Sequence, residues 1–480
     1  MVTTAPPPGL APLPGTAVTL AGGEAYLARA GPRTLLVVSA GVAGFEGCCV
    51  TAGSTELRLV ERTPAAARRL GQLVPWLAPT PLGTARSFGF GDRLGCATPG
   101  HVRALRRAGA GTAPVLAQQS ARELRRSGRT HGEVLAAAVW GVLQAGWRGG
   151  FGADADHLTT TQEVRDGAAA GCTMFTLDPG AHVVEGADLL NGPELAASLE
   201  RLPWSGLDDT PEASRRRHVG RPLPTRWRTI ALDDRRWARA SVRYLRALAA
   251  LATLAAAVPR GADLEVSFDE TASPTTAEEH LYLARELRRL DVPVTSFAPR
   301  LPGRWEKAVD HRGDLEDLTA AVRLHAAIAA AHGGYKLAVH SGSDKHRAYE
   351  ALATAAGGAL HLKTAGTSYL EALRLVARRD PALFRAVAEL AHARYPEDRA
   401  TYAISATGDP RRIRATADGG LPGLLDDPDV RQVLHVTFGS VLTDEVLGVR
   451  LRRAVDEAGD EYWDLLDRHF TRHLAPLGRA

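Results

Sequence analysis

The chain has 480 residues, of which 45% are hydrophobic and 23% charged, an ordinary composition for a globular protein. Its net charge is only +4 and acidic and basic residues alternate, so no basic stripe of the kind that binds nucleic acid is present. The most apolar segment, residues 247–258, is shorter than the roughly 20 residues that span a membrane. We therefore expect neither nucleic acid nor a membrane as a partner.

The sequence of residues 1–80 predicts a small N-terminal α/β lead-in domain, in which no pattern of catalytic or ligand-binding residues is recognisable. Two strand-like runs, Thr34–Ser39 and Glu56–Glu61, flank a glycine-rich piece, and the proline-rich PWLAPTPLG ends the region. The first residues lack the charged start and apolar core of a signal peptide. The four cysteines form no CxxC pair, so we expect reduced thiols in a cytoplasmic protein.

From residue 86 onward, eight strand-like runs each end in polar residues and precede a helix-start signal. They are Ser87–Asp92, Ala113–Gln118, Phe151–Asp156, Thr173–Asp178, Leu264–Asp269, Val292–Ala298, Tyr335–His340 and Ala359–Thr364. Four connections carry a capping-box pattern: Thr130 with Glu133, Thr160 with Glu163, Thr276 with Glu279 and Ser368 with Glu371. Strands that alternate with helices indicate a parallel sheet, and eight such units favour closure into a barrel.

The predicted fold class is thus α/β, with a (β/α)8 TIM-type barrel over residues 81–380. The long gap at about 180–262 is an insertion after the fourth strand, and it contains a long helix over Asp233–Ala257. Residues 381–480 predict a mostly helical C-terminal extension with one late strand at Val433–Phe438.

In such barrels the active site lies at the carboxyl ends of the strands, where this sequence places most of its rare polar residues. Asp154 and Asp178 end the third and fourth strands and are candidates for the catalytic acid and base. Lys363 is the third catalytic candidate, because its position predicts that it faces the barrel axis. Burial beside a metal would lower the pKa of such a lysine.

Carboxylates and imidazoles together at several strand ends suit a divalent metal ion: zinc, manganese, cobalt or nickel. The preferred ligands are Glu270, His340 and His361. His157, with Asp156, is the main alternative, although strand alternation predicts that His157 points away from the pocket. Each of these side chains could instead be a hydrogen-bonded core residue or half of a salt bridge.

The remaining polar residues at the strand ends are candidates for substrate binding: Asp92, Arg93, Gln118, Gln119 and Lys345. Lys345 follows the turn SGSD at a predicted helix start, where amide groups and an ammonium can share one anion. We expect it to hold a substrate carboxylate. No GxGxxG motif leads into a helix, so a dinucleotide site is not predicted.

Several long motifs resemble one known family. SFGFGDRLG, PVLAQQS, GFGADADHL, MFTLDPG, HSGSDK and HLKTAGTSYLEALR are similar to the tagaturonate/fructuronate epimerases, also explored as tagatose 4-epimerases. The similarity covers roughly residues 84–440, with RQVLHVTFGSVL as its last block. It implies a barrel, a divalent metal, and inversion of one hydroxyl-bearing carbon in a small keto-sugar or keto-hexuronate. A homo-oligomer is compatible with it.

The expected activity is the interconversion of D-tagaturonate and D-fructuronate, with D-fructose and D-tagatose as further substrates. The inverted carbon is β to the carbonyl, so simple deprotonation cannot invert it, whereas metal-assisted retro-aldol cleavage and re-addition can. Transient oxidation is the other route, but it needs a hydride acceptor. Three alternatives stay open: a class II-type aldolase, a keto–aldo isomerase on the same metal, and a sugar-binding regulatory protein that lacks catalysis.

Overall fold

A closed barrel of eight parallel strands forms the centre of the computed structural model, which describes residues 6–7, 9–31 and 33–479. The strands are β7 (Ser87–Phe90), β8 (Ala113–Ser120), β9 (Gly152–Leu158), β10 (Met174–Leu177), β13 (Asp263–Ser267), β14 (Ser296–Ala298), β15 (Lys336–Val339) and β16 (Leu360–Thr364). They pair in chain order, and β16 closes the ring on β7. The predicted barrel and all eight of its strands are confirmed.

Helices between the strands cover the outside of the barrel. They are α2 (Thr98–Ala108), α3 (Ala121–Ser127), α4 (His131–Ala145), α5 (Thr161–Ala170), α8 (Asp234–Ala255), α9 (Ala277–Arg289), α10 (Leu315–Ala331), α11 (Tyr349–Ala355) and α12 (Thr367–Arg379). The capping boxes of Thr130, Thr160 and Thr276 form as predicted. The fourth is wrong, because Ser368 lies inside α12 and its hydroxyl donates to the Gly91 carbonyl instead.

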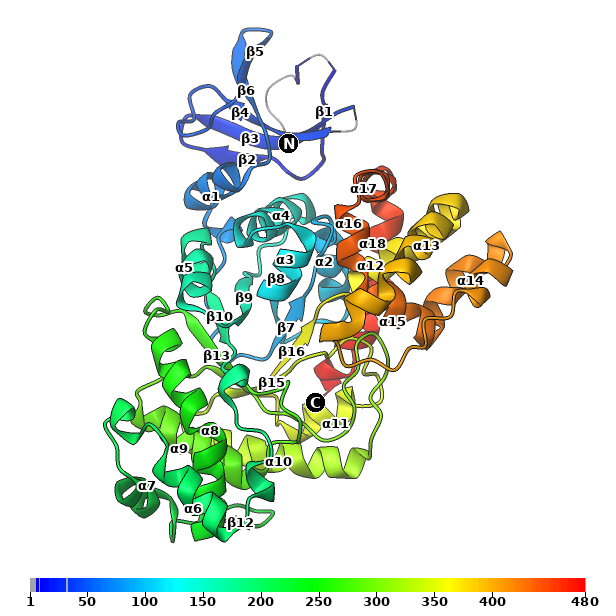
Figure 1. Cartoon of the computed structure of the whole chain (residues 1–480). Helices are drawn as coiled ribbons and strands as arrows, with labels where there is room; N and C mark the ends of the chain where they lie inside the picture. Colours follow the sequence, from blue (N-terminus) through cyan, green and yellow to red (C-terminus); the bar gives the residue numbers. More distant parts are fainter. Residues whose placement is uncertain (1–5, 8, 32, 480) are drawn as a thin grey trace.

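An antiparallel sheet precedes the barrel and lies apart from it in Figure 1. Its strands are β1 (Ala11–Pro12), β2 (Val18–Leu20), β3 (Gly23–Ala30), β4 (Arg33–Ser39), β5 (Cys48–Ala52) and β6 (Thr55–Val60). Helix α1 (Pro64–Leu73) follows and packs on α4. Arg68 of α1 also donates to the Ala169 carbonyl of α5, so the N-terminal region contacts the outer helices of the barrel.

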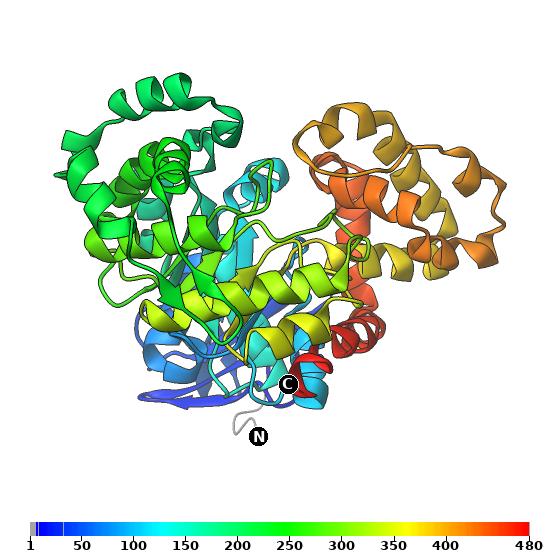
Figure 2. The same cartoon turned by 90° about the horizontal axis from the view of Figure 1, so that it is seen from below.

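Two further groups of elements flank the barrel on opposite sides (Figure 2). The insertion after β10 holds α6 (Gly192–Glu200), α7 (Pro211–His218), β11 (Leu223–Pro224), β12 (Thr229–Ile230) and the start of α8. The C-terminal group holds α13 (Pro381–Asp398), α14 (Arg411–Ala415), α15 (Pro428–Val436), α16 (Phe438–Thr443), α17 (Leu447–Glu457) and α18 (Gly459–Leu474). Helix α18 packs along α2, the first helix of the barrel. Among the described residues, no helix combines the length and apolarity that a membrane crossing requires.

The strand predicted at Val433–Phe438 is wrong, because these residues belong to helices α15 and α16. Asp427 caps α15, where its carboxylate accepts the backbone N–H groups of Asp429 and Val430, and Pro428 occupies the first turn. A short apolar run buried on all sides does not distinguish a strand from a buried helix. The Asp-Pro pair before it is the start signal that identifies the helix.

Candidate active site

A cavity lies at the carboxyl ends of the barrel strands, where the sequence placed the active site. Its wall includes Gln118, Asp156, His157, His340 and Lys363, which come from four different strands or the residues directly after them. All five of these side chains are polar; four are buried, and His157 is partly buried. The barrel thus gathers residues that are far apart in the chain around one small volume.

A β-bulge in β9 places two consecutive residues in this cavity. Asp154 pairs with Met174 and Ala155 with Phe175, but Leu158 pairs with Leu177, so the register shifts between them. His157 takes a φ of 53°, in the left-handed region that few non-glycine residues adopt. As a result both Asp156 and His157 line the cavity, and the prediction that His157 points away is wrong because it assumed unbroken alternation.

Two imidazoles and one carboxylate converge beside the bulge. Asp269 Oδ1 lies 3.0 Å from His340 Nδ1 and 3.6 Å from His157 Nε2. One ligand atom from each of these three residues lies within 4.8 Å of the others. Imidazole nitrogen and carboxylate oxygen are donors that divalent transition metals prefer. We call His157, Asp269 and His340 the mouth trio.

The other ring nitrogen of each histidine is held by a second carboxylate. His157 Nδ1 lies 2.8 Å from Asp156 Oδ1, and His340 Nε2 lies 2.7 Å from Glu265 Oε1. Such carboxylate partners fix the ring orientation of metal-binding histidines. Burial lowers the pKa of His340, but the charges of Asp269 and Glu265 outweigh it and raise that pKa to about 9.

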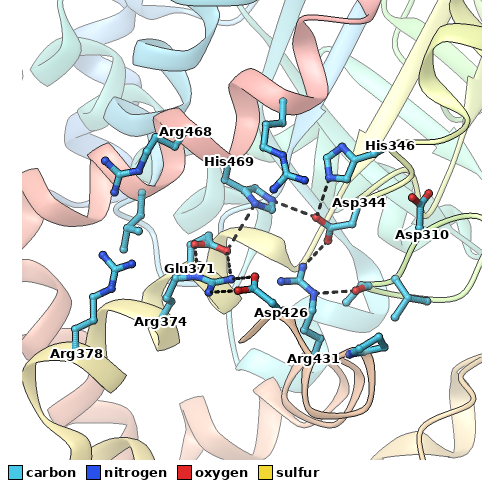
Figure 3. Close-up of a pocket in the computed structure, with 15 residues that line it drawn as sticks. Asp310, Asp344, His346, Glu371, Arg374, Arg378, Asp426, Arg431, Arg468 and His469 are labelled. Carbon is cyan, nitrogen blue, oxygen red and sulfur yellow. Dashed lines mark hydrogen bonds and ion pairs between the residues drawn. The ribbon is translucent and has the colours of Figure 1, made fainter. Parts of the chain in front are cut away.

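A second set of potential ligands is Asp344, His346 and His473. Asp344 and His346 line a different cleft (Figure 3), and His473 is buried beside them. His473 Nε2 accepts the backbone N–H of Asp344 at 3.0 Å, and its Nδ1 donates to the His469 carbonyl. The lone pair that would bind a metal is therefore already used. Asp344 also pairs with Arg431 at 2.6 Å, so this set ties the loop after β15 to helices α15 and α18.

Lys363 lies within a ring of carboxylates at the base of the cavity. Its Nζ is 2.7 Å from Asp154 Oδ2, 2.7 Å from Asp156 Oδ1 and 2.8 Å from Glu265 Oε1. Burial lowers the pKa of Lys363, but the three carboxylates raise it well above its usual value, the opposite of the lowering predicted from the sequence. Burial first, and then the neighbouring carboxylates, raise the pKa of Asp154 to about 6 despite the lysine.

The other predicted metal ligands and the second predicted acid–base residue have different neighbours. Glu270 pairs with Arg122 at 2.9 Å, on the more exposed side of the cavity. His361 Nδ1 contacts Ser87 Oγ at 2.8 Å deep in the barrel, and burial lowers its pKa to about 3. Asp178 accepts the backbone N–H of Gly180, and burial raises its pKa.

Among the predicted substrate-binding residues, Gln118 and Arg93 line the cavity. Gln118 Nε2 donates to the Thr364 carbonyl, while its Oε1 is buried and accepts no hydrogen bond within the described residues. Gly89 makes room for this side chain, because a Cβ at that position would lie 1.6 Å from Gln118 Oε1. Arg93 pairs with buried Glu123 and donates to the His435 carbonyl at 2.8 Å.

Asp92, Gln119 and Lys345 lie outside the cavity wall and bind other parts of the protein. Asp92 accepts three backbone N–H groups, from Leu94, Gly95 and Ala97. Gln119 contacts Ser127 and Arg129. Lys345 Nζ donates to three carbonyl oxygens, those of Glu306, Val309 and Ser343. All three side chains thus hold loops around the site.

Sequence reasoning missed several residues of the cavity wall, among them Arg122, Lys307 and Tyr402. Arg122 lies in the first turn of helix α3, Lys307 lies in the loop between β14 and α10, and Tyr402 lies after α13. None stands at a strand end, so no local pattern marks them. Sequence reasoning also missed Glu265. Asp263, Glu265 and Ser267 of β13, and Asp269 just after it, are two residues apart, the spacing of side chains on one face of a strand.

Comparison with known proteins agrees with this fold and site. The family model for tagaturonate epimerase matches residues 28–477. A tagaturonate/fructuronate epimerase of Thermotoga maritima is 39% identical over 409 residues, which is 84% of this chain and 83% of that protein. Crystal structures of the fructuronate-tagaturonate epimerase UxaE from Cohnella laeviribosi superpose with a TM-score of 0.90 at 30% identity. They cover 98% of this chain, and it covers 96% of the glycerol complex and 97% of the native structure. The chain therefore belongs to the tagaturonate epimerase family, and it is an isomerase of the epimerase class.

Proposed function

We propose that this enzyme interconverts D-tagaturonate and D-fructuronate, and that D-fructose and D-tagatose are weaker substrates. The proposal rests on the polar cavity at the mouth of the barrel. It is supported by the similarity of the chain to proteins named as tagaturonate/fructuronate epimerases. Gln118 Oε1 and Arg122 Nε are buried there without hydrogen-bond partners among the described residues. Because buried polar atoms in native proteins are normally paired, a polyhydroxylated ligand would complete them.

We further propose that the mouth trio binds a divalent metal ion. His157 Nε2, His340 Nδ1 and Asp269 Oδ1 would be its ligands, and their separations of 3.0 and 3.6 Å suit atoms that share one small cation. Asp156 and Glu265 support this assignment, since each holds the distal nitrogen of one histidine. When bound, the metal would supply Lewis-acid stabilisation of negative charge on the substrate's carbonyl oxygen.

The proposed chemistry is retro-aldol cleavage followed by re-addition. A carboxylate, for which Asp178 is the candidate, removes the proton from the hydroxyl on the carbon to be inverted. The bond from that carbon toward the keto group breaks, and its electron pair leaves an enediolate and an aldehyde. The aldehyde rotates, the enediolate attacks its other face, and the proton returns to the new alkoxide. No atom or electron is gained or lost.

Lys363 and Asp154 would assist without accepting the substrate proton. The three carboxylates around Lys363 hold it as an ammonium, whose positive charge would stabilise the alkoxide as it forms. Asp154, directly beneath, positions that ammonium and balances its charge. The aldehyde fragment would have to stay in the cavity until the bond re-forms, because an enzyme that released it would be an aldolase.

Product analysis of the purified enzyme with D-tagaturonate tests the function. The expected product is D-fructuronate alone, and accumulation of three-carbon fragments would favour the aldolase.

Metal analysis of variants tests the mouth trio. Loss of a residue that only supports a metal ligand typically weakens metal binding about ten- to hundredfold, and we expect His157→Ala to weaken it more than that. His346→Ala, in the cleft of Figure 3, is the matched control and should keep its metal. Full metal content in His157→Ala and in Asp269→Ala would refute the assignment.

A further inference from the structure

We propose that Arg122, Lys307 and Tyr402 form a subsite for the carboxylate of the hexuronate. This inference rests on the proposed function and assigns the end of the substrate that the mouth trio does not bind. All three residues line the active-site cavity. They come from α3, from the loop between β14 and α10, and from the segment after α13, so only the folded chain brings them together.

Charge is the first argument for an anion at this place. Arg122 Nη2 donates to Glu270 at 2.9 Å, whereas Lys307 Nζ donates to the neutral hydroxyl of Ser341 at 2.6 Å. Burial and the nearby Arg122 both lower the pKa of Lys307, which reflects two cations crowded together. Glu270 pairs with Arg122, and Glu123 in the same wall pairs with Arg93, so Lys307 forms no ion pair with a carboxylate among the described residues. A ligand carboxylate would restore the balance and offset the cost of withdrawing these charges from water.

Unused hydrogen-bond donors are the second argument. Arg122 Nε and the hydroxyl of Tyr402 are both buried and have no hydrogen-bond partner in the described part of the chain. Burial raises the pKa of Tyr402, so its hydroxyl stays protonated and can donate. A carboxylate has two oxygens with about four acceptor sites, enough for a guanidinium, an ammonium and a phenol at once.

The Tyr402 ring also fixes the direction of the arginine. Its centre lies 5.0 Å from the guanidinium carbon of Arg122 and 4.8 Å from that of Arg126. Arg122 Nη1 donates to the Thr401 carbonyl next to it. The guanidinium is therefore held from both ends before any ligand binds, and such preorganisation favours tight binding.

The subsite would set the preference for uronates over neutral ketohexoses. A ketohexose carries a hydroxymethyl group where the uronate has its carboxylate, so it leaves the two cations without an additional counter-ion. The same residues thus predict both the preferred substrate class and the reason that neutral sugars react more slowly.

The test compares D-fructuronate with D-fructose in three variants, Arg122→Gln, Lys307→Met and Tyr402→Phe. For Arg122→Gln and Lys307→Met we expect kcat/KM with the uronate to fall about ten- to hundredfold, and for Tyr402→Phe about three- to tenfold. The value for the neutral sugar should change less than threefold. Arg125→Gln is the matched control, because Arg125 lies on the same helix and pairs with Glu163 at the surface.

Calorimetric binding of both sugars gives the same comparison without turnover. Equal losses on both sugars, or undiminished uronate binding in all three variants, would overturn the subsite while leaving the epimerase function intact. If the unmodified enzyme converts neither uronate, the proposed function itself fails. The two failures are therefore distinguishable in one set of measurements.

Discussion

Replacing Lys345 by methionine should destabilise the fold without selective loss of uronate binding. The sequence suggests that this lysine holds the substrate carboxylate, but its Nζ lies 2.9, 2.6 and 2.9 Å from the carbonyl oxygens of Glu306, Val309 and Ser343. Burial lowers the pKa of Lys345 to about 7, yet only the ammonium has three hydrogens for three acceptors. The side chain ties the loop after β14 to the loop after β15.

The size of the effect follows from these three bonds. Methionine fills a similar volume but leaves three buried carbonyl oxygens unpaired, at roughly 1–3 kcal/mol each. Because the ammonium is buried, its removal also removes the cost of withdrawing a charge from water, and this offsets part of the loss. We expect a net destabilisation of about 3–5 kcal/mol, which in a protein of this size corresponds to a fall of about 3–5 °C in the unfolding midpoint.

Scanning calorimetry and steady-state kinetics with a uronate and a neutral ketohexose provide the assay. Arg347→Met is the control, because this neighbouring side chain is exposed. In Lys345→Met the KM values for both sugars should change by the same factor. An unchanged unfolding midpoint, together with a rise in KM for the uronate only, would refute the structural role. It would indicate instead that Lys345 binds the substrate carboxylate.

Three further predictions concern the metal, the barrel interior and acid stability. The Glu270→Gln variant should bind as much metal as the unmodified enzyme, because Glu270 pairs with Arg122 rather than with the mouth trio. A lower metal content on elemental analysis would show instead that Glu270 is a metal ligand. Gly89→Ala should lower kcat/KM at least about tenfold while circular dichroism stays unchanged, since its Cβ displaces the side chain of Gln118. Burial lowers the pKa of His101 and of His325 to about 4, so their contribution to stability is complete above pH 6.5 and is lost as the pH falls toward 4. Each contributes up to about 3 kcal/mol, so urea midpoints at pH 7 and pH 4.5 should differ clearly, and equal midpoints would contradict this.

The barrel could be predicted from the sequence because its signals are local. Each strand is a short apolar run, and the caps at Thr130, Thr160 and Thr276 mark where helices begin. The run at Val433–Phe438 shows where this logic fails. Burial on all sides removes the periodicity that separates helix from strand, and tertiary packing decides the outcome.

The candidate site was only partly predictable, for two physical reasons. The bulge at His157 reverses the direction of a side chain, and a sequence pattern cannot reveal an extra residue in a strand. Arg122, Lys307 and Tyr402 lie in loops and helix ends, whose positions depend on the whole fold. His340 and Lys363, by contrast, stand at or near strand ends and were found by position alone.

The packing of α18 on α2 has a consequence for how the protein is made. Tyr462 and Trp463 of α18 donate to the carbonyls of Ser368 and Cys96, and His473 accepts the backbone N–H of Asp344. A ribosome releases this helix after every strand of the barrel has emerged. The nascent barrel therefore lacks this outer brace, and the Asp344 loop lacks its contact with His473, until α18 has emerged.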